Sequence, residues 1–174
     1  TQWKNGTASD KRDLLLDLRD TYDAVRALLD SNGQTDVLIY SDLPVWYDSS
    51  TSIGWVAGER DQWFVDLAES LEGFSMMAYE RDNLGSLTNG VGWEVANFDG
   101  EVRIGLEAQA VGPGETWADF DELMDMADQL DNFYGSSIGG IDFHALRHFA
   151  DLVPFEYLTG DINGDGFVGI DDLN

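Results

Sequence analysis

The spacing of hydrophobic residues along the chain changes repeatedly between a strand-like and a helix-like pattern. Short, mostly apolar runs predict four strands, at Asp36–Ser41, Gly73–Glu80, Val102–Gln109 and Ile138–Phe143. Each run is followed by polar or aromatic residues and then by a helical pattern. The runs begin at intervals close to the roughly 30 residues of a βαβ unit. The pattern therefore predicts a series of strand-then-helix units.

Apolar residues at steps of three and four mark the helices between these runs. A first helix is predicted over Lys11–Leu29, and Gly33 ends it, because glycine readily takes the left-handed conformation after a last turn. Further helices are predicted over Glu59–Leu71, over a segment that ends at Tyr134 and over His144–Leu152.

Two helical segments have less regular signals. Thr116 and Asp119 lie three residues apart, which is the spacing of a capping box, and they predict the start of the helix that ends at Tyr134. Between Leu84 and Phe98 the pattern is weak, because three glycines interrupt what would be a short helix.

Strands that alternate with helices predict an α/β fold with a parallel sheet. Four such units fit either half of a (β/α)8 barrel (a TIM barrel) or a small doubly wound sheet. No glycine-rich phosphate loop follows any predicted strand, although such a loop is typical of dinucleotide-binding sheets. The strands end instead in carboxylates, aromatic residues or histidine, as in a barrel with its active site at the carboxyl ends of the strands. We therefore expect a half barrel over residues 1–153, followed by a linker at 154–160.

Several ionisable side chains fall where a predicted strand enters a loop. Asp42, Glu80 and Glu107 are the carboxylates, and His144 follows the fourth strand. Such groups are candidates for a catalytic or binding site. Each also has an ordinary structural interpretation, since a strand-end carboxylate can pair with a nearby arginine such as Arg103.

Aromatic residues lie in or beside the same loops. Trp46 and Tyr47 follow the first strand, and Tyr79 stands at the end of the second. A flat ring in such a loop can stack on a ligand, but aromatic residues also pack in cores and loops. Both interpretations stay open at this point.

Composition and charge narrow the classes of function. The chain has 174 residues, of which 34 are acidic and 9 basic, and its formal charge is -25. This charge argues against binding to nucleic acid and to anionic membrane surfaces. No apolar run is long enough for membrane insertion, and the absence of cysteine excludes disulfides and a cysteine nucleophile. The chain begins with Thr1 rather than Met, so we interpret it as a fragment.

The last residues carry the most specific motif. Side-chain oxygens recur at loop positions one, three, five and twelve, with glycine at position six, as a calcium-binding loop requires. Ca²⁺ takes about six to eight oxygen ligands, and the backbone carbonyl at position seven can supply another. An ordinary EF-hand has glutamate at position twelve, whereas this loop has aspartate. The expected calcium ligands are Asp161, Asn163, Asp165, the carbonyl of Phe167, and Asp172.

Residues Gly160–Asn174, GDINGDGFVGIDDLN, resemble the first repeat of a type I dockerin. Dockerins attach secreted polysaccharide-degrading enzymes to cohesins, or stand at the C-termini of large secreted bacterial proteins. The resemblance implies Ca²⁺ as a cofactor and an extracellular, secreted or cell-surface location. A dockerin has two such repeats and the resemblance covers one, so a cohesin partner is expected only of the complete module.

The part of the chain before this motif is similar, more diffusely, to the C-terminal half of a glycoside hydrolase (β/α)8 barrel. The resemblance rests on the strand-end sequences SDLPVW, MMAYE, IGLEAQ and GIDFH, which would be barrel strands five to eight. In the large clan of retaining barrel glycosidases the nucleophile is a glutamate at the end of strand seven, which corresponds to Glu107. The acid/base residue at the end of strand four would then lie upstream of Thr1.

Glycoside hydrolysis gives this assignment a physical basis. The retaining mechanism needs two carboxyl groups about 5 Å apart, one ionised as nucleophile and one protonated as acid. Glu107 is the first candidate for the nucleophile, while Asp42 and Glu80 either take that role or bind sugar hydroxyls. The expected substrate-binding residues are Trp46, Tyr47, Tyr79 and His144.

The expected protein is therefore a fragment of a secreted glycoside hydrolase that acts on a polysaccharide or oligosaccharide and carries a dockerin calcium repeat. The alternative is a non-catalytic secreted or surface protein, in which a degenerate barrel binds glycan or protein and the dockerin is an anchor. A carboxylate at the end of barrel strand four would favour the enzyme.

Overall fold

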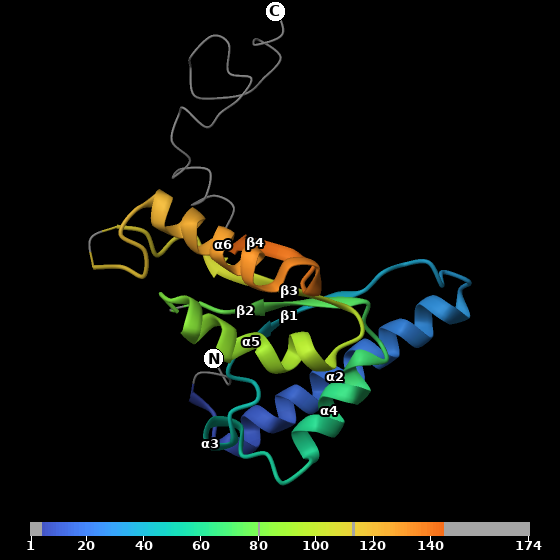
Figure 1. Cartoon of the computed structure of the whole chain (residues 1–174). Coiled ribbons are helices and arrows are strands. Elements are labelled where there is room, and N and C mark those ends of the chain that lie inside the picture. Colours follow the sequence, from blue (N-terminus) through green and yellow to red (C-terminus); the bar gives the residue numbers. More distant parts are fainter. Residues whose placement is uncertain (1–4, 80, 113, 145–174) are drawn as a thin grey trace, which may run out of the picture.

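The chain folds around a four-stranded parallel sheet with helices packed beside it (Figure 1). A computed structural model describes residues 5–79, 81–112 and 114–144. The strands follow one another across the sheet in the order in which they occur along the chain. The predicted α/β fold with a parallel sheet is confirmed. The strands are β1 (Tyr40–Pro44), β2 (Gly73–Met77), β3 (Glu101–Glu107) and β4 (Gly140–His144).

The strand order can be compared with the two predicted architectures. A doubly wound sheet reverses direction at a switch point, so its first strand lies between two others. Within the described part of the chain β1 is an edge strand, and each later strand pairs with the one before it. This sequential order is compatible with consecutive units of a barrel.

The helices are connected so that they cover one face of the sheet. A right-handed crossover between neighbouring parallel strands puts each connecting helix on the same side. Figure 1 shows α2, α4 and α5 grouped together beneath the sheet, and α6 packs against both α5 and β4. The helices are α2 (Ala8–Ser31), α3 (Ser50–Ile53), α4 (Glu59–Ala68), α5 (Leu84–Asn97) and α6 (Phe120–Tyr134), followed by the 3-10 turn η1 (Gly135–Ser137).

α2 begins three residues before the predicted start because a capping box precedes it. The Thr7 hydroxyl accepts a hydrogen bond from the backbone N–H of Asp10 at 3.2 Å. The Asp10 carboxylate in turn accepts from the backbone N–H of Thr7 at 2.8 Å. These reciprocal bonds satisfy amide groups that a helix start leaves without partners. At the other end, Gly33 has a φ of 69° and turns the chain out of the helix as predicted.

The first strand starts at Tyr40, four residues later than predicted. The apolar side chains of Val37 and Leu38 remain exposed instead of entering the sheet. Just before the strand, Glu72 accepts hydrogen bonds from the backbone N–H of Ile39 at 2.6 Å and from Arg26 at 2.5 Å. This carboxylate therefore fixes the position at which the chain enters β1.

One predicted helix start is wrong, and one weakly indicated helix is confirmed. The box predicted at Thr116 is wrong, because Asp119 itself caps α6 and accepts from the backbone N–H of Glu122 at 2.9 Å. The weak segment after Leu84 forms a helix of 14 residues despite its glycines. Its residues Leu87, Val91 and Glu94 are buried at helical spacing, so packing outweighs the low helix propensity of glycine.

The core lies between the sheet and the helices. Phe64 of α4 is buried in its centre, with its ring edge-on to Phe74, Trp93 and Phe98 at centroid distances of 5.5, 5.0 and 5.9 Å. Edge-to-face aromatic pairs of this kind add about 0.5–1.5 kcal/mol each beyond the area that they bury. The strands contribute the buried residues Leu43, Phe74, Met76, Val102, Ile104 and Leu106.

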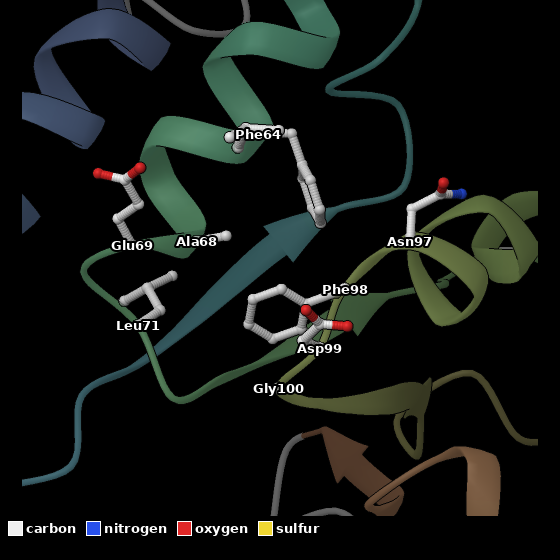
Figure 2. A pocket seen from close by; sticks show the side chains of 9 residues that line it. Phe64, Ala68, Glu69, Leu71, Asn97, Phe98, Asp99 and Gly100 are labelled. Carbon is white, nitrogen blue, oxygen red and sulfur yellow. The ribbon is translucent and has the colours of Figure 1, made fainter.

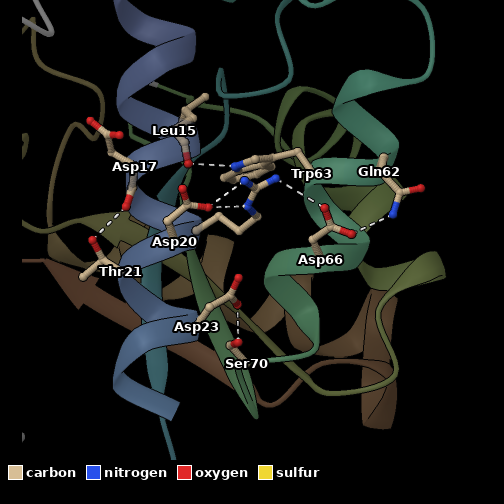
Figure 3. A network of polar contacts seen from close by, with 10 residues as sticks. Leu15, Asp17, Asp20, Thr21, Asp23, Gln62, Trp63, Asp66 and Ser70 are labelled. Carbon is tan, nitrogen blue, oxygen red and sulfur yellow. Dashed lines mark hydrogen bonds and ion pairs between the residues drawn. The ribbon is translucent and has the colours of Figure 1, made fainter. Parts of the chain in front are cut away.

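Polar contacts fasten α2, which precedes the sheet, to α4 (Figure 3). The buried Trp63 donates its indole N–H to the carbonyl of Leu15 at 2.7 Å. Arg19 pairs with Asp66 across the two helices at 3.3 Å. α2 is therefore part of the same packed unit as the strands and helices that follow it.

Candidate functional site

Alternate residues of each strand point to opposite faces of the sheet. One set lies under the helices and is apolar, as described above. The other set is largely polar, and no described helix covers it; we call this side the open face. The register aligns its members in rows across the strands. Its side chains are Tyr40, Asp42, Ser75, Met77, Glu101, Arg103, Glu107, Asp142 and His144.

At the amino ends of the strands the open face holds an ion-pair network centred on Arg103. Its guanidinium donates to Asp142 at 2.8 Å and to Glu101 at 2.9 Å. The Tyr40 hydroxyl donates to Glu101 at 3.1 Å. Asp142 and then Glu101 raise the pKa of Arg103, and Arg103 lowers the pKa of Glu101. Tyr40 reaches across Gly73, where a Cβ would lie 2.5 Å from the tyrosine ring.

At the carboxyl ends the open face brings predicted site residues together. Glu107 and His144 are register partners on β3 and β4. The His144 ring lies against the ring of Tyr79, with centroids 4.9 Å apart and planes tilted by 33°. Burial raises the pKa of Tyr79 to about 12, and the negative charges of Asp42, Glu107 and Asp142 add to this shift. Carboxylates from three different strands therefore act on one phenol, which stays protonated at neutral pH.

The loop that follows β3 holds Glu107 in place. Its backbone carbonyl accepts from the indole N–H of Trp117 at 3.2 Å, and its carboxylate accepts from the Gln109 amide at 2.5 Å. Trp117 is 1% exposed and is itself tied to Ala110 by a backbone hydrogen bond of 2.8 Å. The half-buried carboxylate therefore sits at the rim of the open face and not beneath the helices.

A small hollow lies beside this rim, between the ends of β1 and β2. It has a volume of about 230 Å³, and its lining includes Trp46, which is 39% exposed. The volume is below the roughly 300–1,000 Å³ of pockets that enclose drug-sized ligands. It suits one ring-sized group with an apolar side. The other lining residues are Pro44, Val45, Met77 and Tyr79.

Tyr47 does not belong to this rim, contrary to the prediction from the sequence. The side chain is fully buried beneath the sheet, with its ring 5.2 Å from Trp63. Its hydroxyl donates to the buried carboxylate of Glu94 at 2.8 Å. Burial raises the pKa of Tyr47, so the phenol remains a donor. This pair could not be predicted from the sequence, because Glu94 lies in the glycine-interrupted segment.

The remaining predicted residues lie outside the described part of the chain. These are Glu80, the helix expected after His144 and the calcium ligands Asp161, Asn163, Asp165, Phe167 and Asp172. Among the described residues, no group of three or more metal-ligating side chains could hold a metal ion. The described helices include none that is both long enough and apolar enough to cross a membrane.

A second hollow lies at the opposite ends of the strands (Figure 2). It has a volume of about 450 Å³ and is lined by Phe64 and Phe98, with the carboxylates of Glu69 and Asp99 nearby. Leu71 and Gly100, which lead into β2 and β3, belong to its lining. Ligands of parallel α/β sheets bind at the carboxyl ends of the strands. We therefore do not assign this hollow to the candidate site.

Comparison with known proteins finds no match, whether among protein-family models, curated proteins or solved structures. The chemistry of the site must therefore follow from its own residues. A carboxylate, an imidazole and aromatic rings meet at the carboxyl ends of neighbouring parallel strands. This combination can bind a polar, ring-shaped ligand and offer it a nucleophile or a base.

Proposed function

We propose that this chain is part of a (β/α)8-barrel glycoside hydrolase and that Glu107 is its nucleophile. The observation that carries the proposal is the grouping of Glu107, His144 and Tyr79 at the carboxyl ends of sequentially ordered parallel strands. Enzymes of the barrel fold build their active sites at this end from residues of several strands. The four βα units would form the C-terminal half of the barrel.

The open face supports the idea of a larger barrel. Parallel sheets occur almost only where both faces are covered, yet the described helices cover one face of this sheet. The other face carries the Arg103 network, whose members are about two-thirds buried even without a covering element. Further strands that continue the sheet would enclose this network and complete the rim around Glu107.

In the proposed reaction the Glu107 carboxylate attacks the anomeric carbon of a sugar and forms a covalent glycosyl ester. The bond to the leaving oxygen breaks, and a protonated carboxyl from the other half of the barrel, about 5 Å away, donates its proton to that oxygen. Water then hydrolyses the ester, with the second carboxylate acting as base. Asp42 remains an alternative nucleophile, but it lies inside β1, in register with Ser75 and Arg103, and not at the end of a strand as predicted.

The other residues of the rim would bind the substrate. The protonated hydroxyl of Tyr79 can donate a hydrogen bond to a sugar oxygen or to Glu107. The hollow beside Trp46 offers an aromatic surface to the apolar side of a sugar ring. His144 is exposed beside Glu107, where it can bind a hydroxyl group. The substrate would be a polysaccharide or oligosaccharide.

The C-terminal motif extends the proposal. Asp161, Asn163, Asp165, Phe167 and Asp172 would bind Ca²⁺ as part of a dockerin. The enzyme would then be secreted or attached to a cell surface, and a complete dockerin would bind a cohesin.

The nucleophile is tested with Glu107→Gln in the full-length protein. The change keeps size and shape but removes the charge, so turnover of oligosaccharides should be lost while the protein stays folded. The matched control is Glu101→Gln, the same change on the same strand and the same face, which should retain turnover. Normal turnover by Glu107→Gln would exclude the proposed role. A wild-type protein that binds oligosaccharides without hydrolysing them would favour the non-catalytic alternative.

Calcium binding is tested by calorimetry on the chain extended through a second repeat. We expect heat of binding from the wild type and its loss in Asp165→Ala, because removing one carboxylate weakens an oxygen-ligand site. The control Asp128→Ala removes an exposed acid from α6 and should leave binding unchanged. Equal heats from Asp165→Ala and wild type would contradict the motif assignment.

A further inference from the structure

The turn after β1 places two neighbouring aromatic residues on opposite sides of the sheet. The backbone N–H of Tyr47 donates to the carbonyl of Pro44 at 2.9 Å, and that of Ser49 donates to the carbonyl of Trp46 at 3.1 Å. These consecutive turns leave Trp46 39% exposed at the hollow, while Tyr47 is fully buried. The position of Trp46 therefore depends on how firmly Tyr47 is held.

The ring, the backbone carbonyl and the hydroxyl of Tyr47 each make a contact that holds the residue in place. Its ring packs 5.2 Å from the ring of Trp63. Its carbonyl accepts from the indole N–H of Trp55 at 2.7 Å. Its hydroxyl donates to Glu94 at 2.8 Å, and this bond is fully buried. A buried hydrogen bond to a carboxylate is among the strongest that a side chain makes, so Glu94 is the main polar anchor of the turn.

Glu94 is an unusual residue for a helix interior face, since only 2% of it is exposed. Burial raises the pKa of its carboxyl group, and the hydrogen bond from Tyr47 opposes that shift. Asp48 from the turn, Arg60 from α4 and Tyr134 from α6 also lie within its electrostatic reach. An apolar residue would fill this site without a desolvation cost. A carboxylate here indicates a role other than filling the core.

We propose that Glu94 and Tyr47 are positioning residues for ligand binding, because their buried hydrogen bond fixes the turn that presents Trp46 to the hollow. Neither side chain touches the ligand, and both lie on the covered side of the sheet. The inference rests on the proposed function only for the identity of the ligand. The coupling between the buried bond and Trp46 is a property of the protein alone and can be measured without ligand.

The first experiment measures Trp46 directly. The chain has six tryptophans, so the signal of Trp46 is the difference between each protein and its Trp46→Phe counterpart. Tyr47→Phe removes the hydroxyl and keeps the ring, and it should increase the acrylamide quenching of Trp46. Tyr134→Phe is the matched control, since it removes another hydroxyl near Glu94 from α6. It should leave the quenching unchanged.

Glu94→Gln separates positioning from folding. Glutamine keeps the volume of the side chain and an acceptor for the Tyr47 hydroxyl, so the quenching of Trp46 in this variant should be close to the wild-type value. Glu94→Leu keeps an apolar filling but offers no acceptor, and it should match Tyr47→Phe. If Tyr47→Phe fails to fold, the Gln and Leu variants test the coupling without it. Trp46 quenching that is the same in Glu94→Leu as in wild type would overturn the proposal.

The second experiment uses an oligosaccharide that the full-length wild-type protein hydrolyses. Tyr47→Phe and Glu94→Leu should raise KM by about tenfold, which corresponds to the net free energy that one hydrogen bond contributes. The value of kcat should stay within about twofold of wild type. A fall in kcat with unchanged KM would contradict a role in positioning Trp46. A wild-type protein without turnover would remove the proposed function, while the quenching experiment would still decide the coupling.

Discussion

The two faces of the sheet are built from alternate residues of the same strands, yet they differ in burial and in the kind of contact that their side chains make. On the covered face Leu43, Met76 and Ile104 are completely buried under the helices. On the open face, Arg103 and Glu107 are only partly buried and take part in polar contacts. The covered face is defined by hydrophobic packing, which any apolar residue of suitable size can supply. The open face is defined by particular chemical groups, which are the ones that can bind or react with a ligand.

The open face itself has two ends with different chemistry. At the amino ends Arg103 satisfies the carboxylates of Glu101 and Asp142. At the carboxyl ends Glu107 receives a hydrogen bond from the neutral amide of Gln109. The positive charge of a guanidinium compensates the charge of a paired carboxylate. A carboxylate that accepts a hydrogen bond from a neutral amide keeps an uncompensated negative charge, which can act as a nucleophile. The difference supports Glu107 over Glu101 and Asp142 as the reacting group.

The strongest contrast between the faces should come from two neighbouring methionines. Met76 is completely buried on the covered face, whereas Met77 is half-buried on the open face. Met76→Ala should lower the free energy of unfolding by about 2–5 kcal/mol, because it removes buried methylene groups and leaves a cavity. Met77→Ala should cost less than about 1 kcal/mol. Urea denaturation of both variants measures the difference, and equal losses would show that the open face is as tightly packed as the covered one.

A smaller loss is expected where the open face is charged. Arg103→Leu leaves Glu101 and Asp142 without their shared cation, and we expect the free energy of unfolding to fall by about 1 kcal/mol. Adding Asp142→Asn to this variant should restore part of the loss, because the two acids no longer repel each other. The loss should shrink at high salt, since partly exposed charges are screened. A loss that is independent of salt and of Asp142→Asn would show that Arg103 acts by packing alone.

The hydrophobic pattern predicted most of the covered face. It indicated all four strands, although the first begins four residues later than predicted, and the buried side of α4 with Trp63, Phe64 and Leu67 is the one that apolar spacing indicates. It failed where local polar contacts set the boundaries, as at Thr7, whose capping box starts α2, and at Glu72, which delays β1. Such contacts join residues through side-chain oxygens and leave no trace in hydrophobic periodicity.

The residues of the candidate site that lie at the ends of strands could be predicted from the sequence. Glu107 and His144 were predicted as strand-end residues, and the parallel register makes them neighbours. Tyr47 was misplaced because a turn, unlike a strand, does not fix which of two adjacent aromatic residues points inward. Glu94 was missed because a buried carboxylate in a helix has no signature apart from its partner, which lies 47 residues away in the sequence.

The buried Glu94 also makes a prediction about pH. Its pKa in the folded protein is raised above the ordinary value of 4.5, so the folded state binds this proton more tightly than the unfolded state does. Its contribution to stability is therefore fully present below about pH 4.5 and is lost as the pH rises through the raised value. Glu94→Gln does not titrate. The stability of the wild type relative to Glu94→Gln should fall as the pH rises through this range, as measured by urea denaturation at several pH values. A constant difference would show that Glu94 titrates normally.

The smallest effect on stability should come from the proposed nucleophile. Glu107→Gln replaces a rim carboxylate whose partner is a neutral amide, and a glutamine can make a similar contact. We expect the free energy of unfolding to change by less than about 0.5 kcal/mol. Glu101→Gln makes the same replacement six residues earlier on β3, where it removes one partner of Arg103, and should cost more at low salt than at high salt. If Glu107→Gln were the more destabilising of the two, Glu107 would be a structural member of the open face. A nucleophile at a rim should instead be dispensable for folding, because its charge is needed only when a substrate is bound.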